Sequence, residues 1–192
     1  MNEALKNIAE KFIDLFGTRD AFVKSKPEEI ESLKGLSGDK VSSFIDFYKD
    51  YNPNNVKMTD SYVSLLDIEH ILIENTDAEP GKFLSKLGLI VFATTIGGNP
   101  VCIDSKAATN GDAPVYICDI DFCNYNEALD MVEIGWPSAK LSKKLEGDDS
   151  TIELTYENAV LCMKTVEESF ITFMKKLSEN DYDDLEEFLS ED

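Results

Sequence analysis

The sequence predicts an α+β fold, with strands in the middle of the chain and helices at both ends. Three observations support it: β-branched apolar runs separated by turns between Leu89 and Asp121, apolar residues at helical spacing before Tyr51, and another such stripe after Thr165. The 192 residues can form one well-buried core, and no Pro- or Gly-rich linker divides them. We therefore predict a single domain over residues 1–178, followed by an acidic tail over 179–192.

The N-terminal part of the chain predicts three helices. Apolar residues at helical spacing indicate a helix over about Asn2–Phe16, which Gly17 would end. Pro27 and the two acids after it mark the start of a second, short helix that runs to about Lys34. A third helix, over about Asp39–Tyr51, places its apolar stripe toward the core and its charged residues toward water.

A strand and a short helix follow. Tyr62–Leu66 reads as a strand, and Asp67–Ile73 as a helix whose cap is either Ser64 or Asp67. The next segment, Asn75–Lys82, reads as a polar connection.

A hairpin is the clearest element of the predicted sheet. Leu89–Thr95 is a β-branched apolar strand, Ile96–Pro100 is a turn, and Val101–Asp104 is the returning strand. Gly97 and Gly98 could cradle an anion, but no helix begins directly behind them and the chain is strongly acidic. They are therefore interpreted first as turn residues.

Pro114–Asp121 reads as a strand that is apolar on both faces, as expected when a strand is buried on two sides. Asp119 and Asp121 are two residues apart, so on a strand both carboxylates would point to the same side near its end. Glu127 and Asp130 follow downstream. Such acids could end the strand and cap the loop, contact a basic partner, hold a hard cation or run acid–base chemistry.

The alternatives for these acids differ in how well the neighbouring residues fit them. A calcium loop is a poor fit, because Cys123 stands at the fifth position and Asn124 at the sixth, where the sharp turn needs glycine. Trp136 is interpreted either as core or as the aromatic anchor of an interface. We predict no catalytic or metal-binding residue, and a partner-binding surface made of Asp119, Asp121, Glu127, Asp130 and Trp136.

The last part of the chain is predicted less regularly. Tyr125–Ile134 could be a helix or an irregular excursion, and the alternation over Ile152–Tyr156 suggests a strand. Thr165 and Glu168 form a capping-box pattern at the start of a C-terminal helix. Beyond that helix, an acidic segment could form a short amphipathic turn, but a frayed, solvated tail is favoured.

The charge of the chain restricts its partners. With 38 acidic and 18 basic side chains the net charge is -20, which opposes binding to nucleic acid and to anionic membranes and favours a basic protein. Eight of the acids and none of the bases follow Ser178, so residues 1–178 still have a net charge of -12. Acidity that serves only solubility is the alternative.

Most catalytic motifs are missing. The sequence has no phosphate-binding Gly-x-x-x-x-Gly-Lys loop, no His-Glu-x-x-His and no Gly-x-Ser-x-Gly, and its single histidine, His70, is more typical of a surface residue than of a catalytic one. We predict no cofactor.

Three features of the sequence indicate where the protein acts. The four cysteines form no Cys-x-x-Cys pair, no apolar run approaches the roughly 20 residues of a membrane helix, and the N-terminus lacks a signal peptide. A cytoplasmic protein is expected.

Five short segments follow one another in a recognisable order: Pro27–Tyr48, Tyr62–Glu69, Ile96–Asp104, Val115–Asp119 and Ser169–Met174. In this order they resemble the SUKH superfamily, the Smi/Knr-like group that includes many bacterial immunity proteins against secreted toxins. The resemblance spans roughly Pro27–Leu177. It departs from the family at Ser37, where proline is common, at Asn52 and Pro53, where asparagine and glycine are expected, and over Phe122–Val160, which is longer than the usual connection and suggests an insertion.

The resemblance implies a central twisted, mainly antiparallel sheet flanked by N-terminal helices and a closing C-terminal helix. It also implies protein binding without catalysis. The expected function is a cytoplasmic immunity protein that neutralises a cognate toxin, often a nuclease, so the expected partner is a basic, secreted toxin domain. The alternatives are a regulatory scaffold of the cell-wall-signalling type and a small metal-dependent hydrolase using Asp119, Asp121 and Glu127.

Overall fold

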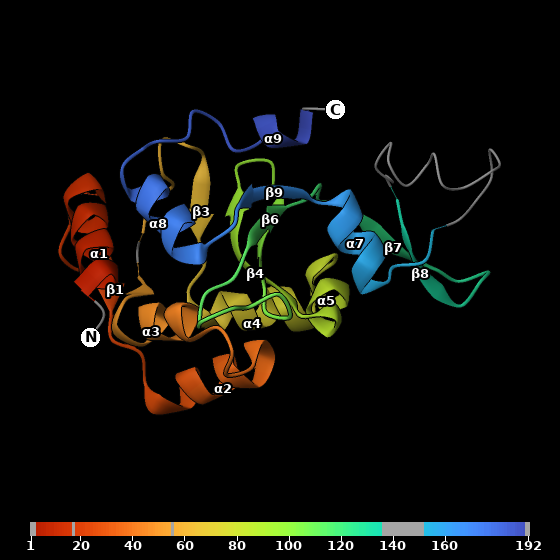
Figure 1. The fold of residues 1–192 in the computed structure, drawn as a ribbon, viewed down its shortest axis with the longest axis horizontal. Coiled ribbons are helices and arrows are strands. Elements are labelled where there is room, and N and C mark those ends of the chain that lie inside the picture. The colour runs from red at the N-terminus through yellow and green to blue at the C-terminus, as the bar shows by residue number, and fades with distance from the viewer. Residues whose placement is uncertain (1–2, 17, 55, 136–151, 191–192) are drawn as a thin grey trace.

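The fold is α+β, as the sequence predicts. The structure is a computed structural model that describes residues 3–16, 18–54, 56–135 and 152–190. A five-stranded antiparallel sheet, in the order β3-β4-β5-β6-β9, lies at its centre (Figure 1). The N-terminal helices and a C-terminal helix that packs on the first helix flank this sheet, which confirms the predicted architecture.

The central sheet is joined by two smaller, two-stranded sheets. The central strands are β3 (Val63–Leu65), β4 (Leu89–Thr95), β5 (Pro100–Asp104), β6 (Val115–Ile117) and β9 (Lys164–Glu167). The smaller sheets pair β1 (Phe22–Val23) with β2 (Asn52–Pro53), and β7 (Cys123–Asn126) with β8 (Met131–Ile134). The described residues form eight α-helices and one 3-10 helix: α1 (Glu3–Phe16), α2 (Pro27–Ser37), α3 (Ser42–Asp50), α4 (Ile68–Thr76), α5 (Gly81–Leu84), η1 (Ser85–Leu87), α7 (Tyr156–Cys162), α8 (Phe170–Ser178) and α9 (Glu187–Ser190).

The three predicted N-terminal helices are present, with shifted ends. Gly17, the predicted end of the first helix, lies outside the described residues. The helix α2 continues past Gly35 and ends before Gly38, whose φ of 74° few other residues adopt. The helix α3 begins at Ser42, three residues after the predicted start.

Side-chain caps fix where α2 and α4 begin. The Glu29 carboxylate accepts a hydrogen bond from the Lys26 backbone amide at 2.8 Å. Asp67, and not Ser64, caps α4, because its carboxylate accepts from the His70 amide at 2.8 Å. The polar connection predicted over Asn75–Lys82 is partly wrong, since α4 runs to Thr76 and α5 begins at Gly81.

The two faces of the central sheet pack against different elements. The hairpin β4–β5 is confirmed, and its register shifts between Val91 and Ala93, so Phe92 forms a bulge. One face packs on α3 and α8 through aromatic rings, with Phe44 and Phe92 each 5.4–5.5 Å from the Phe170 ring centroid. The other face packs on α5, α7 and the start of β7.

Three predictions for the C-terminal half need correction. The hypothesis of a helix or excursion at Tyr125–Ile134 is replaced by the hairpin β7–β8. The strand predicted over Ile152–Tyr156 is partly confirmed, because Glu153 forms an antiparallel bridge with Glu133, but α7 begins at Tyr156. Thr165 is not a helix cap, because it pairs with Tyr116 in the sheet. Ser169 caps α8 instead, accepting from the Thr172 amide at 3.1 Å.

The acidic C-terminal segment packs on the body of the protein, so the interpretation of a frayed, solvated tail is wrong. Leu185 is fully buried and Tyr182 nearly so. The Ser61 hydroxyl donates to the Tyr182 carbonyl at 2.7 Å, and the Tyr182 hydroxyl donates to Glu167 at 2.9 Å. The division into a domain over 1–178 and a tail over 179–192 stays a prediction. None of the helices in the described ranges combines the length and apolar character that a membrane crossing requires.

Candidate protein-binding surface

The predicted acidic pair lies in a turn and not on a strand. The strand β6 ends at Ile117, so Asp119 and Asp121 follow it in the connection to β7, where both are exposed. The expectation that a strand would point both carboxylates to one side is therefore wrong. The Asp119 carboxylate accepts from the Asp121 amide at 2.8 Å, which closes the turn, as the capping interpretation of these acids requires.

The second predicted pair lies at the other end of the same hairpin. Glu127 and Asp130 belong to the turn between β7 and β8, and both are exposed. The Tyr125 hydroxyl donates to the Asp130 carboxylate. Trp136, the remaining predicted site residue, lies outside the described residues. Here "acidic hairpin" denotes residues 119–135, with Asp119 and Asp121 at its base.

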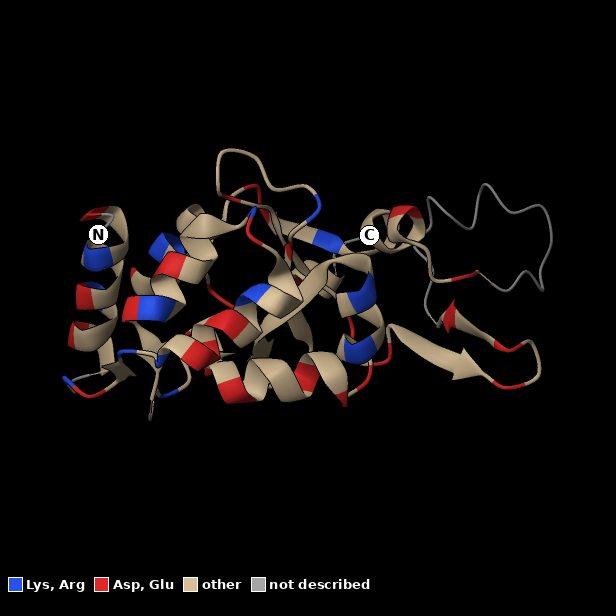
Figure 2. Cartoon of the chain, turned by 90° about the horizontal axis from the view of Figure 1, so that it is seen from below, with Lys and Arg blue, Asp and Glu red and all other residues tan. Residues whose placement is uncertain are grey.

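The acidic hairpin carries negative charge without compensation. Residues 107–139 contain six acids and no lysine or arginine. Within the described part of the chain, no lysine or arginine nitrogen lies within 4.0 Å of the carboxylates of Asp119, Asp121, Glu127 or Asp130. Figure 2 shows basic and acidic segments interleaved on the helices, whereas the projecting hairpin shows acidic segments alone. The whole chain has the same asymmetry, with 17 acids and 12 bases up to Lys106, but 21 acids and 6 bases after it.

Apolar side chains accompany these acids. Ile120, Tyr125 and Leu129 are exposed to 45%, 46% and 53%. The sequence reasoning missed Ile120 and Leu129. Their signal was an apolar residue directly beside aspartate in a segment without basic residues. A surface with exposed apolar and aromatic groups among charges of one sign is suited to protein recognition.

A hollow of about 440 Å³ lies at the base of the acidic hairpin. Its lining comes from Glu79, Ile120, Asp121, Cys123, Asn124 and Gly135. A side chain at position 135 would place its Cβ only 2.8 Å from the Asp121 carbonyl oxygen, so glycine is needed there. The hollow thus has two carboxylates and an exposed isoleucine at its wall.

Comparison with known proteins places the chain in a family. The sequence model described as the SMI1 / KNR4 family (SUKH-1) matches residues 42–138, which is half of the chain. The chain belongs to this family. The match runs from the start of α3 to just past β8, and so includes the acidic hairpin. It is narrower than the resemblance over Pro27–Leu177, since α2, α7 and α8 lie outside it. No curated protein and no solved structure matches this chain.

The cysteines and the histidine of this SUKH-1 protein show no arrangement typical of a catalytic site among the described residues. Burial raises the pKa of the Cys118 thiol strongly and that of Cys123 to about 12, so both thiols are protonated and unreactive at neutral pH. His70 is exposed, and a hydrogen bond with Asp67 raises its pKa. Among the described residues, no three His, Cys, Asp or Glu side chains are placed to hold a metal ion together.

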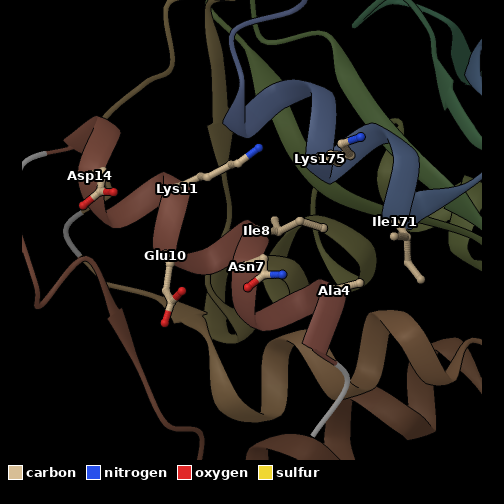
Figure 3. A pocket seen from close by; sticks show the side chains of 8 residues that line it. All are labelled: Ala4, Asn7, Ile8, Glu10, Lys11, Asp14, Ile171 and Lys175. Carbon is tan, nitrogen blue, oxygen red and sulfur yellow. The ribbon is translucent and has the colours of Figure 1, made fainter.

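Another hollow lies away from the acidic hairpin, between α1 and α8. This groove of about 490 Å³ has Ile8 and Ile171 in its wall, and Lys11 extends across it toward α8 (Figure 3). Lys11 forms an ion pair with Glu179, and Glu10 also belongs to the lining. Because its charges have both signs, the groove does not favour a basic partner as the acidic hairpin does.

Proposed function

We propose that this SUKH-1 protein is a non-catalytic immunity protein that acts in the cytoplasm by binding and neutralising a cognate toxin. One observation carries the proposal: a projecting hairpin in which acids stand beside exposed apolar residues, with no lysine or arginine of the described residues forming an ion pair with them. Membership of the SUKH-1 family supports the general role.

The charge of this surface suits a toxin that acts on nucleic acid. A nuclease needs a basic surface to bind the phosphate backbone. An acidic protein that covers this surface gains a fast electrostatically steered association and blocks the substrate at the same time. Packing of apolar groups then lengthens the life of the complex, since dissociation rates set most affinity differences.

The described residues suggest how the contact would divide its roles. The carboxylates of Asp119, Asp121, Glu127 and Asp130 would attract the partner, and Ile120, Tyr125 and Leu129 would pack against it. The hollow at the hairpin base would take a lysine or arginine side chain beside Asp121, while Glu79, which also lines the hollow, already pairs with Lys82 at 2.6 Å. We include Trp136 in the proposed contact as an aromatic anchor, and this assignment rests only on the sequence.

The test is co-expression with a candidate toxin from the same source, followed by binding kinetics on the purified pair. Wild-type protein should restore growth and form a salt-sensitive complex. The double variant Asp119→Asn, Asp121→Asn should slow association by about tenfold at low salt, because two steering charges are lost. The control, Glu28→Gln with Asp39→Asn, removes two exposed acids from the ends of α2 and should change the association rate far less.

Three outcomes would contradict the proposal. The toxin could remain active with the wild-type protein present, the two double variants could bind equally, or affinity capture could retain signalling enzymes in place of a toxin. The last outcome would favour a regulatory scaffold.

A further inference from the structure

A carboxylate from the C-terminal segment occupies a cradle on the β4–β5 turn. The Gly97 amide donates to Glu186 Oε1 at 2.8 Å, the Asn99 side-chain amide donates at 3.1 Å, and the Thr95 hydroxyl donates to the same oxygen. All three donors are neutral, and no lysine or arginine of the described ranges forms an ion pair with Glu186. The cradle therefore holds a carboxylate by the geometry of its donors.

The turn is shaped for this carboxylate. A Cβ atom at position 97 would lie 2.5 Å from Glu186 Oε1, so a side chain there would displace the carboxylate from its present position. The Thr95 hydroxyl also accepts from the Asn99 backbone amide at 3.1 Å, which orients the hydroxyl toward Glu186. Gly97 thus binds a carboxylate as well as turning the chain, and the carboxylate comes from this same protein, whereas the Gly98 amide donates to the Thr95 carbonyl within the turn.

The same turn touches the base of the acidic hairpin. The Asn99 side-chain oxygen accepts from the Ile120 amide at 3.0 Å, while its nitrogen donates to Glu186. A Cβ atom at Gly98 would lie 3.0 Å from the end of the Ile120 side chain. One side chain, Asn99, therefore joins the C-terminal segment to the hairpin base, and Figure 1 shows the C-terminal segment crossing this end of the sheet.

We propose that the β4–β5 turn, the hairpin base and the C-terminal segment form one docking surface, which we name the composite face. Ile96 and Ile120, exposed to 61% and 45%, are its apolar centre. Its carboxylates are Asp119, Asp121, Asp183 and Asp184. This proposal rests on the proposed function and specifies its partner: a segment of a basic protein in which arginine or lysine flanks an apolar side chain. Glu186 is the positioning residue that holds the C-terminal carboxylates at this face.

Hydrogen exchange of the full-length chain tests the positioning role. In Glu186→Ala and in Gly97→Ala, the amides of residues 182–189 should exchange about tenfold faster, because the cradle loses its carboxylate or is blocked. The control, Asp181→Ala, removes the same charge from an exposed position in the same segment, outside the composite face, and should leave exchange unchanged. Equal protection in all four proteins would overturn the role of Glu186.

Binding of two synthetic peptides tests the composite face. The probes are nonapeptides that differ at one residue, with Arg-Leu-Arg or Arg-Ser-Arg at the centre, and the readout is the amide chemical shift in a labelled full-length chain. The leucine peptide should shift amides in 95–99, 119–121 and 182–187, and bind Glu186→Ala several-fold more weakly than Asp181→Ala. Equal binding of the two peptides, or shifts limited to Glu127–Asp130, would overturn the proposal.

The two proposals can fail separately. Growth rescue that Glu186→Ala and Ile120→Ser leave intact, together with equal binding of both peptides, would preserve the immunity function and reject the composite face. Peptide binding at the composite face without any rescue would reject the immunity function alone.

Discussion

The two faces of the central sheet differ in how their side chains pack. On the face toward α3 and α8, the rings of Phe44, Phe92, Phe170 and Phe173 form edge-to-face contacts with one another. On the other face, which α5, α7 and β7 cover, cysteines are mixed with aliphatic side chains and with rings such as that of Phe122.

This difference suggests that one face contributes mainly to the stability of the fold, whereas the other supports the surface proposed for partner binding. The face toward α3 and α8 belongs to the larger of the two hydrophobic clusters, so it should supply more of the folding free energy. On the other face, which packs against α5, α7 and β7, the chain leaves the sheet to form the acidic hairpin. A hairpin supported by a packed sheet can present exposed charge without making the fold depend on it.

The largest expected effect comes from a pair of truncations on adjacent strands. Phe92→Ala should lower the free energy of unfolding by about 3–5 kcal/mol, because a large cavity replaces a fully buried ring. Cys102→Ala, on the opposite face, deletes one heavy atom and should cost about 0.5–1.5 kcal/mol. Urea unfolding of both variants measures the difference. Equal losses would refute the division of roles between the faces.

The next largest effect on stability should come from Asp112, which caps the start of α8. Asp112 accepts from the Phe170 amide at 3.0 Å and from the Ser169 hydroxyl, at the start of α8. Asp112→Ala should cost about 1–2 kcal/mol in unfolding free energy, since these donors lose their acceptor. Asp112→Asn keeps one acceptor oxygen and should cost less. A loss of the same size in both variants would show that the charge, and not the acceptor, matters.

The Glu186 contact should make stability depend on acid pH. Hydrogen bonds, first from Thr95 and then from Gly97 and Asn99, lower the pKa of Glu186 below its ordinary value of 4.5. A group with a lowered folded pKa stabilises the protein above its unfolded pKa, and this contribution is lost as pH falls through the folded pKa. The melting temperature of wild type should therefore exceed that of Glu186→Gln by a constant margin above about pH 6, and the margin should shrink below about pH 4. A margin that is the same at pH 7 and pH 3 would contradict the contact.

The smallest effect belongs to His70, which lies outside both proposed surfaces. Its pKa is raised by the hydrogen bond with Asp67, so its contribution to stability is present below the unfolded pKa and lost as pH rises through the folded pKa. The side chain is 63% exposed, so the change in stability should be small. Proton NMR of this single histidine should show a pKa that falls in Asp67→Asn and changes less in Glu69→Gln. A pKa that does not respond to Asp67 would refute the contact.

Local sequence patterns predicted most of the helices and strands up to β6, but not β1, β2, α5 or η1. The helix near Pro27, the Asp67 cap and the β4–β5 hairpin depend on residues within one or two turns of each other, so their spacing was sufficient to predict them. The α+β fold class and the acidity of the hairpin followed in the same way. The sequence predicts Asp119, Asp121, Glu127 and Asp130 as partner-binding residues because acids without neighbouring lysine or arginine are visible in a sequence, and this assignment stays a prediction.

The remaining features depended on contacts between residues far apart in the chain. Thr165 has the spacing of a helix cap, but pairing with Tyr116 made it part of a strand. Glu186 lies in a segment whose acidic composition is typical of a solvated tail. Hydrogen-bond donors 87–91 residues away nevertheless hold its carboxylate in place. Local propensity costs or gains only a fraction of a kcal/mol per residue, so a strand partner or three converging hydrogen bonds outweighs it. Such partners are set by the tertiary fold, and for that reason only the structure revealed the composite face.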